Sequence, residues 1–145
     1  QMSVIELDGL KNFNNVREIK LPGIENTWKI KFDDNYRVQS SLIATQVDKL
    51  YQEQSSDDYE DELLDLSPAE RRKRLASDMN KFKKACVDGL SALLQDDEAG
   101  EEIYKAMGNS TEICAQIIGK INQTADEVLN VAKDEAATEK YDTER

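Results

Sequence analysis

The sequence predicts a predominantly helical α+β fold, in which a small N-terminal antiparallel hairpin or sheet packs on three to four helices. Two observations support this prediction. Residues 27–32 alternate apolar and polar side chains, which is the period of a strand with one buried face. After residue 36 the apolar side chains recur every three or four positions, which is the period of an amphipathic helix.

These patterns divide the chain into four parts. Residues 2–54 form a unit of two or three strands and one helix, and residues 55–66 form an acidic linker. Residues 67–133 form a helical unit, and residues 134–145 form a flexible C-terminal tail.

The strands come first. Trp28, Ile30 and Phe32 share one face of the third apolar run, and Pro22-Gly23 supplies a turn before it. A sheet of two or three short strands is marginally stable unless helices cover its apolar face. The predicted strands are residues 4–7, 16–21 and 27–32.

A first helix is predicted over residues 36–54, because Asp33 and its neighbours offer N-cap oxygens and the apolar positions follow helical spacing. The segment 55–66 that follows has acidic side chains and no basic ones, so we expect a mobile linker there. The apolar positions of the helix include Ile43, Val47, Leu50 and Tyr51.

Ser67-Pro68-Ala69-Glu70 is the strongest helix start in the chain. Ser67 can accept a hydrogen bond from the Glu70 backbone N–H, and Pro68 stands at the first helical position, where its missing N–H costs nothing. The helix carries a continuous apolar stripe: Leu75, Met79, Phe82, Cys86, Leu90 and Leu93. Its other face carries a basic patch: Arg71, Arg72, Arg74, Lys81, Lys83 and Lys84.

Two more helices follow. Asp96-Asp97 can cap a short helix that Gly108 ends in a left-handed conformation, and Asn109-Ser110-Thr111-Glu112 has the form of a second capping box. The last helix has an expected inner face of Ile113, Ile117, Ile121, Ala125, Val128 and Ala132. This stripe fades beyond residue 134, so residues 134–145 are expected to fray unless a partner binds them.

The charge is large and unevenly distributed. The chain has 30 acidic and 19 basic residues, for a net charge of −11. Residues 1–50 are neutral, 51–66 carry −7, 67–95 carry +4 and 96–145 carry −8. An acidic chain is a poor binder of phosphate backbones, so we expect no nucleic-acid partner and a basic or polar protein partner instead. The alternative is that these charged segments are simply solvent-exposed faces and linkers.

The sequence offers little support for catalysis. It has no histidine, and its two cysteines form no C-x-x-C pair, which removes imidazole catalysis and the common zinc sites. Asp96 opens a segment that superficially resembles a calcium loop, but Glu101 stands where that loop needs glycine. Cys86 lies on the apolar stripe and Cys114 near a helix start, and we expect both to be core residues. We therefore predict a protein that is not an enzyme, with no catalytic residue, metal or cofactor.

Several segments together resemble the small tail assembly chaperones of long-tailed (siphovirus-type) bacteriophages or prophages. An opening strand (28–34) precedes a helix, and a later helix (82–90) leads through a short acidic, Gly-containing segment into Glu-Glu-Ile-Tyr (101–104). A Gly-Asn turn (108–109) and a final helix with Ile-Ile (117–118) complete the likeness. Leu-Leu-Gln stands where the family more often has Leu-Gly or Phe-Gly.

The resemblance implies a function. Such chaperones bind and solubilise the tape measure protein during tail assembly by oligomeric coating, and tail tube subunits then replace them. The implied partners are the tape measure protein and the tail tube protein, with self-association, no membrane partner and a place in the bacterial cytoplasm, outside the mature virion. No apolar run approaches the length of about 20 residues that spans a bilayer. The candidate partner-binding residues are Arg71, Arg72, Arg74, Leu75, Met79 and Phe82.

Three other readings stay open. The first is a structural tail or virion component that is retained in the particle. The second is an acidic inhibitor that mimics DNA, against which the positive charge of residues 67–95 argues. The third, an enzyme, has the least support. For each candidate residue, simple core packing or solvation is as good an interpretation as partner binding.

Overall fold

The computed structural model describes residues 2–144, and it describes side chains as far as residue 130. Within these residues the chain has five α-helices and a two-stranded antiparallel sheet, which confirms the predominantly helical α+β fold. The elements are η1 (Asp8–Leu10), β1 (Val16–Ile19), β2 (Trp28–Lys31), α1 (Asp34–Gln54), α2 (Asp57–Asp65), α3 (Pro68–Leu94), α4 (Ala99–Ala106) and α5 (Thr111–Glu144).

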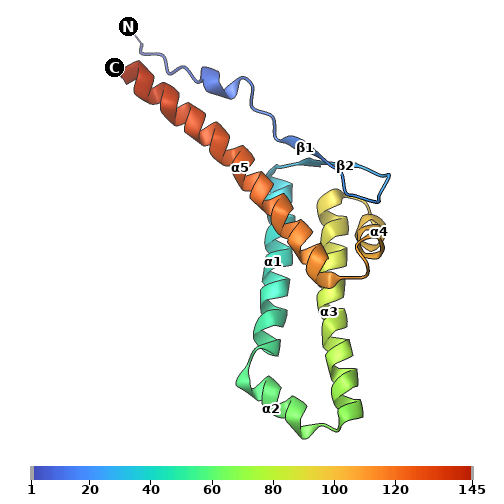
Figure 1. Ribbon diagram of the computed structural model, residues 1–145. Helices are drawn as coiled ribbons and strands as arrows, with labels where there is room; N and C mark the ends of the chain where they lie inside the picture. The colour runs from blue at the N-terminus through green and yellow to red at the C-terminus, as the bar shows by residue number, and fades with distance from the viewer. Residues whose placement is uncertain (1, 145) are drawn as a thin grey trace.

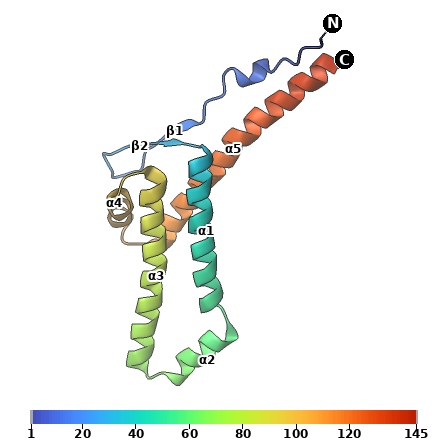
Figure 2. The same ribbon diagram turned by 180° about the vertical axis from the view of Figure 1, so that it is seen from behind.

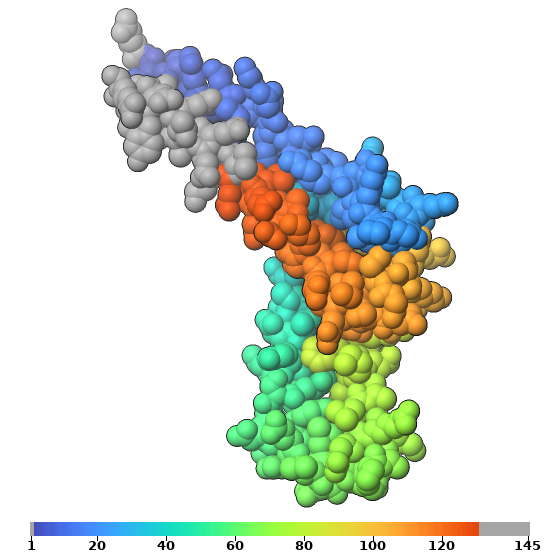
Figure 3. Space-filling model, in the orientation of Figure 1, coloured from blue at the N-terminus to red at the C-terminus, as the bar shows by residue number. Residues whose placement is uncertain are grey.

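Two long helices form the frame of the molecule. Helices α1 and α3 lie side by side in opposite directions, and α2 joins them at one end (Figures 1 and 2). The sheet and α4 lie at the other end, where α5 crosses the pair. Figure 3 shows the joined ends of α1 and α3 projecting from the body as a separate lobe. We call this lobe, residues 46–82, the distal arm.

The sheet packs its apolar face inward. Its register places Ile19 opposite Trp28, and Trp28, Ile30 and Phe32 are all buried, as the alternation predicted. The prediction of a strand at residues 4–7 is wrong, because β1 pairs with β2 and no strand in the described chain lies beside that segment. A strand with no neighbour to share its backbone hydrogen bonds does not form.

The helix starts follow the predicted caps except at α4. There the N-cap is Glu98, which makes no side-chain cap hydrogen bond, and the Asp96 carboxylate accepts from the Glu98 N–H instead. The Asp33 carboxylate accepts from the Tyr36 N–H at 2.9 Å, and the Ser67 hydroxyl accepts from the Glu70 N–H at 3.2 Å. Ser110 caps α5 in the same way. The Glu70 side chain differs from a full capping box, because it accepts from the Ser67 hydroxyl at 3.0 Å. Gly108 ends the α4 turn at φ +73°, as predicted.

The segment 55–66, which was expected to be a mobile linker, contains the helix α2. The Ser56 hydroxyl accepts from the Tyr59 N–H at 3.2 Å, which caps the helix. The acidic side chains that suggested a linker stand in the first turn, where the helix dipole stabilises negative charge. These first-turn residues are Asp57, Asp58 and Glu60.

One core unites the sheet with all the helices except α2. The predicted units 2–54 and 67–133 share it, since Ile43 of α1, Leu90 of α3 and Ile121 of α5 belong to one buried cluster. The Trp28 indole N–H donates to the Asp96 carboxylate at 3.0 Å, which ties the sheet to the α3–α4 loop. This hydrogen bond helps to lower the pKa of Asp96 below its usual value.

The predicted apolar stripes are partly wrong. On α3 the second half of the stripe is buried, whereas Leu75 and Met79 are exposed because the distal arm extends beyond the core. On α5 the inner face turns by about one residue, so Ile113 is exposed. Ala132 and the predicted flexible tail, 134–145, lie outside the residues whose side chains are described. The buried face of α5 contains Cys114, Ile118, Ile121, Ala125 and Val128.

Candidate partner-binding surface

The six predicted partner-binding residues all lie on the first half of α3, within the distal arm. Leu75 is 47% exposed and Met79 is 55% exposed, so the structure leaves both in water. Arg72 is also exposed, whereas Phe82 is half-buried. The exposed apolar pair therefore remains available to a partner. The two other arginines have structural roles.

Arg71 holds the end of α2. Its Nε donates to the Leu63 carbonyl at 2.8 Å, and its Nη2 donates to the Leu66 carbonyl at 3.2 Å. These carbonyls lie at the C-terminal end of α2, where no further turn of helix supplies donors. The guanidinium therefore caps α2, a structural role that the sequence did not indicate, and partner binding by Arg71 stays a prediction.

Arg74 belongs to an acidic network at the junction of α2 and α3. Its Nε lies 3.1 Å from the Asp78 carboxylate and its Nη2 lies 3.4 Å from Glu62. The guanidinium also lies over the Tyr59 ring, 5.5 Å from its centroid. The charge of Arg74 is thus already paired within the chain, so Arg74 helps to hold α2, and its role in partner binding stays a prediction.

Asp78 is the centre of this network. It is 3% exposed and the one buried charged residue found in the described chain. The Tyr59 hydroxyl donates to it at 2.7 Å, and Lys81 approaches to 3.6 Å. Burial acts to raise the pKa of Asp78, but the hydrogen bond from Tyr59 and the positive charge of Arg74 outweigh it and lower the pKa below its usual value.

A shallow groove lies beside the exposed stripe. It has a volume of about 480 Å³ and runs along the first two turns of α3. Its lining residues are Pro68, Arg71, Arg72, Leu75 and Ala76. Leu64 of α2, which is 71% exposed, lies in the same arm. Sequence reasoning missed Leu64, because it lay in a segment read as a linker, although its apolar side chain among acidic neighbours was a signal.

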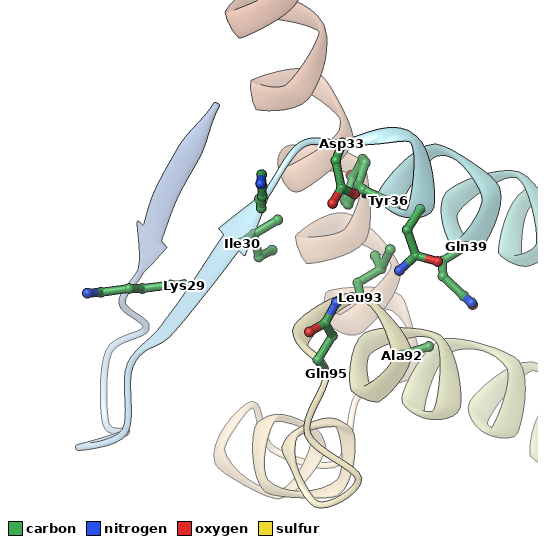
Figure 4. Close-up of a pocket in the computed structure, with 10 residues that line it drawn as sticks. Lys29, Ile30, Asp33, Tyr36, Gln39, Ala92, Leu93 and Gln95 are labelled. Carbon is green, nitrogen blue, oxygen red and sulfur yellow. Dashed lines mark hydrogen bonds between the residues drawn. The ribbon is translucent and has the colours of Figure 1, made fainter. Parts of the chain in front are cut away.

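A second pocket lies between β2, α1 and the end of α3, and it has a volume of only about 40 Å³. Figure 4 shows Tyr36 and Leu93 on opposite sides of it, with Lys29 pointing away. The Asp33 carboxylate at its edge already caps α1. The residues that the structure describes contain no group of three His, Cys, Asp or Glu side chains placed to hold a metal ion.

Both cysteines are free and buried, as predicted. Burial raises the pKa of the Cys86 and Cys114 thiols above their usual values, which keeps them protonated. We expect neither thiol to react with Ellman's reagent at pH 8 in the native protein, and both to react once urea unfolds it. Rapid modification of a native thiol would contradict this assignment to the core.

No family model, no curated protein and no solved structure matches this chain. Among the described residues, no helix has the length and apolar character that crossing a membrane requires. The candidate surface therefore rests on its own geometry: an exposed apolar pair, a shallow groove and an unpaired arginine on a projecting helical arm.

Proposed function

We propose that this protein binds and solubilises another polypeptide during assembly, as a phage tail assembly chaperone that acts on the tape measure protein. The observation that carries the proposal is the exposed apolar stripe on the distal arm, where Leu75 and Met79 lie in water beside a shallow groove. Exposed apolar side chains that lie together on a protein surface are typical of sites that bind another protein.

The shape of this surface suits a reversible partner. A shallow groove offers modest contacts, and a chaperone that later leaves its target needs many weak contacts more than one deep pocket. Arg72 is exposed beside the apolar pair and adds a positive charge to the surface. The resemblance of residues 27–130 to tail assembly chaperones supplies the specific target.

A double substitution tests the surface. We expect Leu75→Asp with Met79→Asp to abolish solubilisation of the tape measure protein encoded in the same genome, because two charges replace the apolar contact. The loss in affinity should be roughly tenfold or more, since exposed anchors contribute about 1–2 kcal/mol each. The measurement is the amount of target that co-purifies with the tagged chain after co-expression.

The matched control is Ile113→Asp, which places the same charge at an exposed apolar position on α5. It should bind the target as the unmodified chain does. All three chains should have the same far-UV circular dichroism, because the substituted side chains lie in water. No complex with the unmodified chain, or equal capture by the double variant, would refute the proposal.

The second candidate function is a structural component retained in the particle. Such a component would use the same surface, but it would remain in the finished virion, from which a chaperone is absent. Mass spectrometry of purified virions separates the two. Detection at a copy number comparable to that of tail proteins would favour the structural component over the chaperone.

A further inference from the structure

The N-terminal segment is apolar, extended and exposed. Val4 is 79% exposed, Ile5 is 84% exposed and Leu7 is 50% exposed, although no helix or strand of the described chain includes them. Figures 1 and 2 show this segment running away from the sheet beside α5. Exposing three neighbouring aliphatic side chains to water is unfavourable, and in the monomer no partner covers them.

A groove of matching character lies between β1 and α5. Its volume is about 320 Å³, which is enough for a few aliphatic side chains. The floor is apolar and belongs partly to the core, so it is firmly held. The apolar lining residues are Ile19, Leu21, Phe32, Ile117 and Ile121.

The charges of the segment and the groove are complementary. Arg17, Lys20 and Lys120 border the groove together with one acidic residue, Glu18, whereas residues 4–7 of the segment carry one charged side chain, Glu6. The border of the groove therefore has a net positive charge in a chain whose net charge is −11. An extended apolar segment that carries an acidic side chain therefore fits this groove better than one with a basic side chain or no charge.

The segment does not reach the groove of its own chain. Its continuation, η1, packs against α5 and directs residues 2–7 away from the sheet. Backbone hydrogen bonds from Leu10 to Leu7 and from Phe13 to Leu10 fix this direction. A second copy can present the same segment without disturbing these contacts.

We infer that residues 4–7 of one copy dock in extended form in the β1–α5 groove of a second copy, so that the chain self-associates through its N-terminal segment. Ile5 and Leu7 supply the apolar contact, and Glu6 faces the basic border. An extended segment beside a strand is a common mode of peptide recognition. This contact is heterologous and can repeat from copy to copy. The inference needs only this chain and does not depend on the proposed target.

The first test is the mass in solution, measured by gel filtration with light scattering on the full chain from about 10 to 500 µM. The average mass should rise above the monomer with concentration. Ile5→Asp with Leu7→Asp should hold the chain at the monomer mass over the same range. The control Leu42→Asp, at an exposed position on α1, should associate as the unmodified chain does. A monomer at every concentration, or equal association of the Ile5–Leu7 variant, would overturn the inference.

The second test locates the contact by mixing two singly substituted chains. Ile5→Cys on one chain and Lys120→Cys on the other should form a disulfide on mild oxidation, since both native thiols are buried. Replacing Lys120→Cys by Lys49→Cys, on the α2 end of α1, should reduce that product at least tenfold. Equal yields from the two mixtures would overturn the inference. So would a chain carrying both Ile5→Cys and Lys120→Cys that closes only on itself.

The third test uses charge reversal in mixtures. Lys120→Glu should weaken association about two- to fivefold, as expected for one exposed ion pair, and Glu6→Lys on the partner should restore it. Substitution is a sharper probe than salt, because salt also screens the mutual repulsion of two acidic chains. Association that Lys120→Glu leaves unchanged would place Lys120 outside the contact, and a loss that Glu6→Lys does not rescue would overturn the pairing of Glu6 with this border. A negative result in these tests does not affect the target-binding experiment. The self-association inference and the proposed function can therefore be refuted independently.

Discussion

Gly100→Ala should be strongly destabilising, because α4 lies against α3 with no room for a methyl group. A Cβ atom on Gly100 would come within 1.9 Å of the Val87 carbonyl oxygen, and that atom belongs to the α3 backbone. The Gly100 N–H also donates to the Ser91 hydroxyl at 2.9 Å. An alanine must push the two helices apart and break this hydrogen bond, at a cost of about 3 kcal/mol.

The matched control for this substitution is Gly119→Ala on α5. A Cβ on Gly119 meets no atom within 4 Å, so alanine should stabilise the helix by about 0.5–1 kcal/mol. Thermal unfolding followed by circular dichroism checks both chains. The midpoint of Gly100→Ala should fall by roughly 6–12 °C, whereas that of Gly119→Ala should rise slightly. An unchanged midpoint for Gly100→Ala would mean that α4 does not pack on α3 this closely.

The Gly100 prediction illustrates which features of the fold can be predicted from the sequence. The order of strands and helices follows from local rules, since Ser67 and Ser110 are caps that need only their own neighbours. Close approach of two helices is different, because Gly100 contacts residues nine and more positions away. The sequence therefore shows a glycine at position 100, but it does not indicate that the absence of a side chain there lets α4 pack closely on α3.

The apolar stripes show the same limit. Periodicity correctly places Leu75, Met79 and Leu90 on one face of α3, but it does not report how much of the helix another element covers. Burial ends where α3 extends beyond the sheet and α5. For the candidate surface, the sequence thus identified the exposed apolar pair, but it did not indicate that Arg71 contacts the end of α2 or that Arg74 pairs with Asp78 of its own helix and with Glu62 of α2.

Asp78→Ala should loosen the contact between α2 and α3 in the distal arm. The substitution removes the acceptor of the Tyr59 hydroxyl and the carboxylate that pairs with Arg74, so α2 loses one of its polar contacts with α3 while those of Arg71 remain. The cost should be about 1–3 kcal/mol and should be local, because α2 is not part of the core cluster. Amide hydrogen exchange should accelerate in α2 and stay unchanged around Leu90. The control is Asp88→Ala, which removes an exposed carboxylate from the same helix.

The same network should weaken in acid. Because the pKa of Asp78 in the folded protein lies below its usual value, its contribution to stability is complete above about pH 4, the pKa region of an unfolded aspartate. The contribution is lost as the pH falls through the folded pKa. The difference in α2 exchange between Asp78→Ala and the unmodified chain, compared at matched pH, should therefore be full at pH 6 and shrink below pH 4. A difference that does not shrink as the pH falls through the folded pKa of Asp78 would show that the carboxylate charge does not hold α2, and that the hydrogen bond from Tyr59 suffices without it.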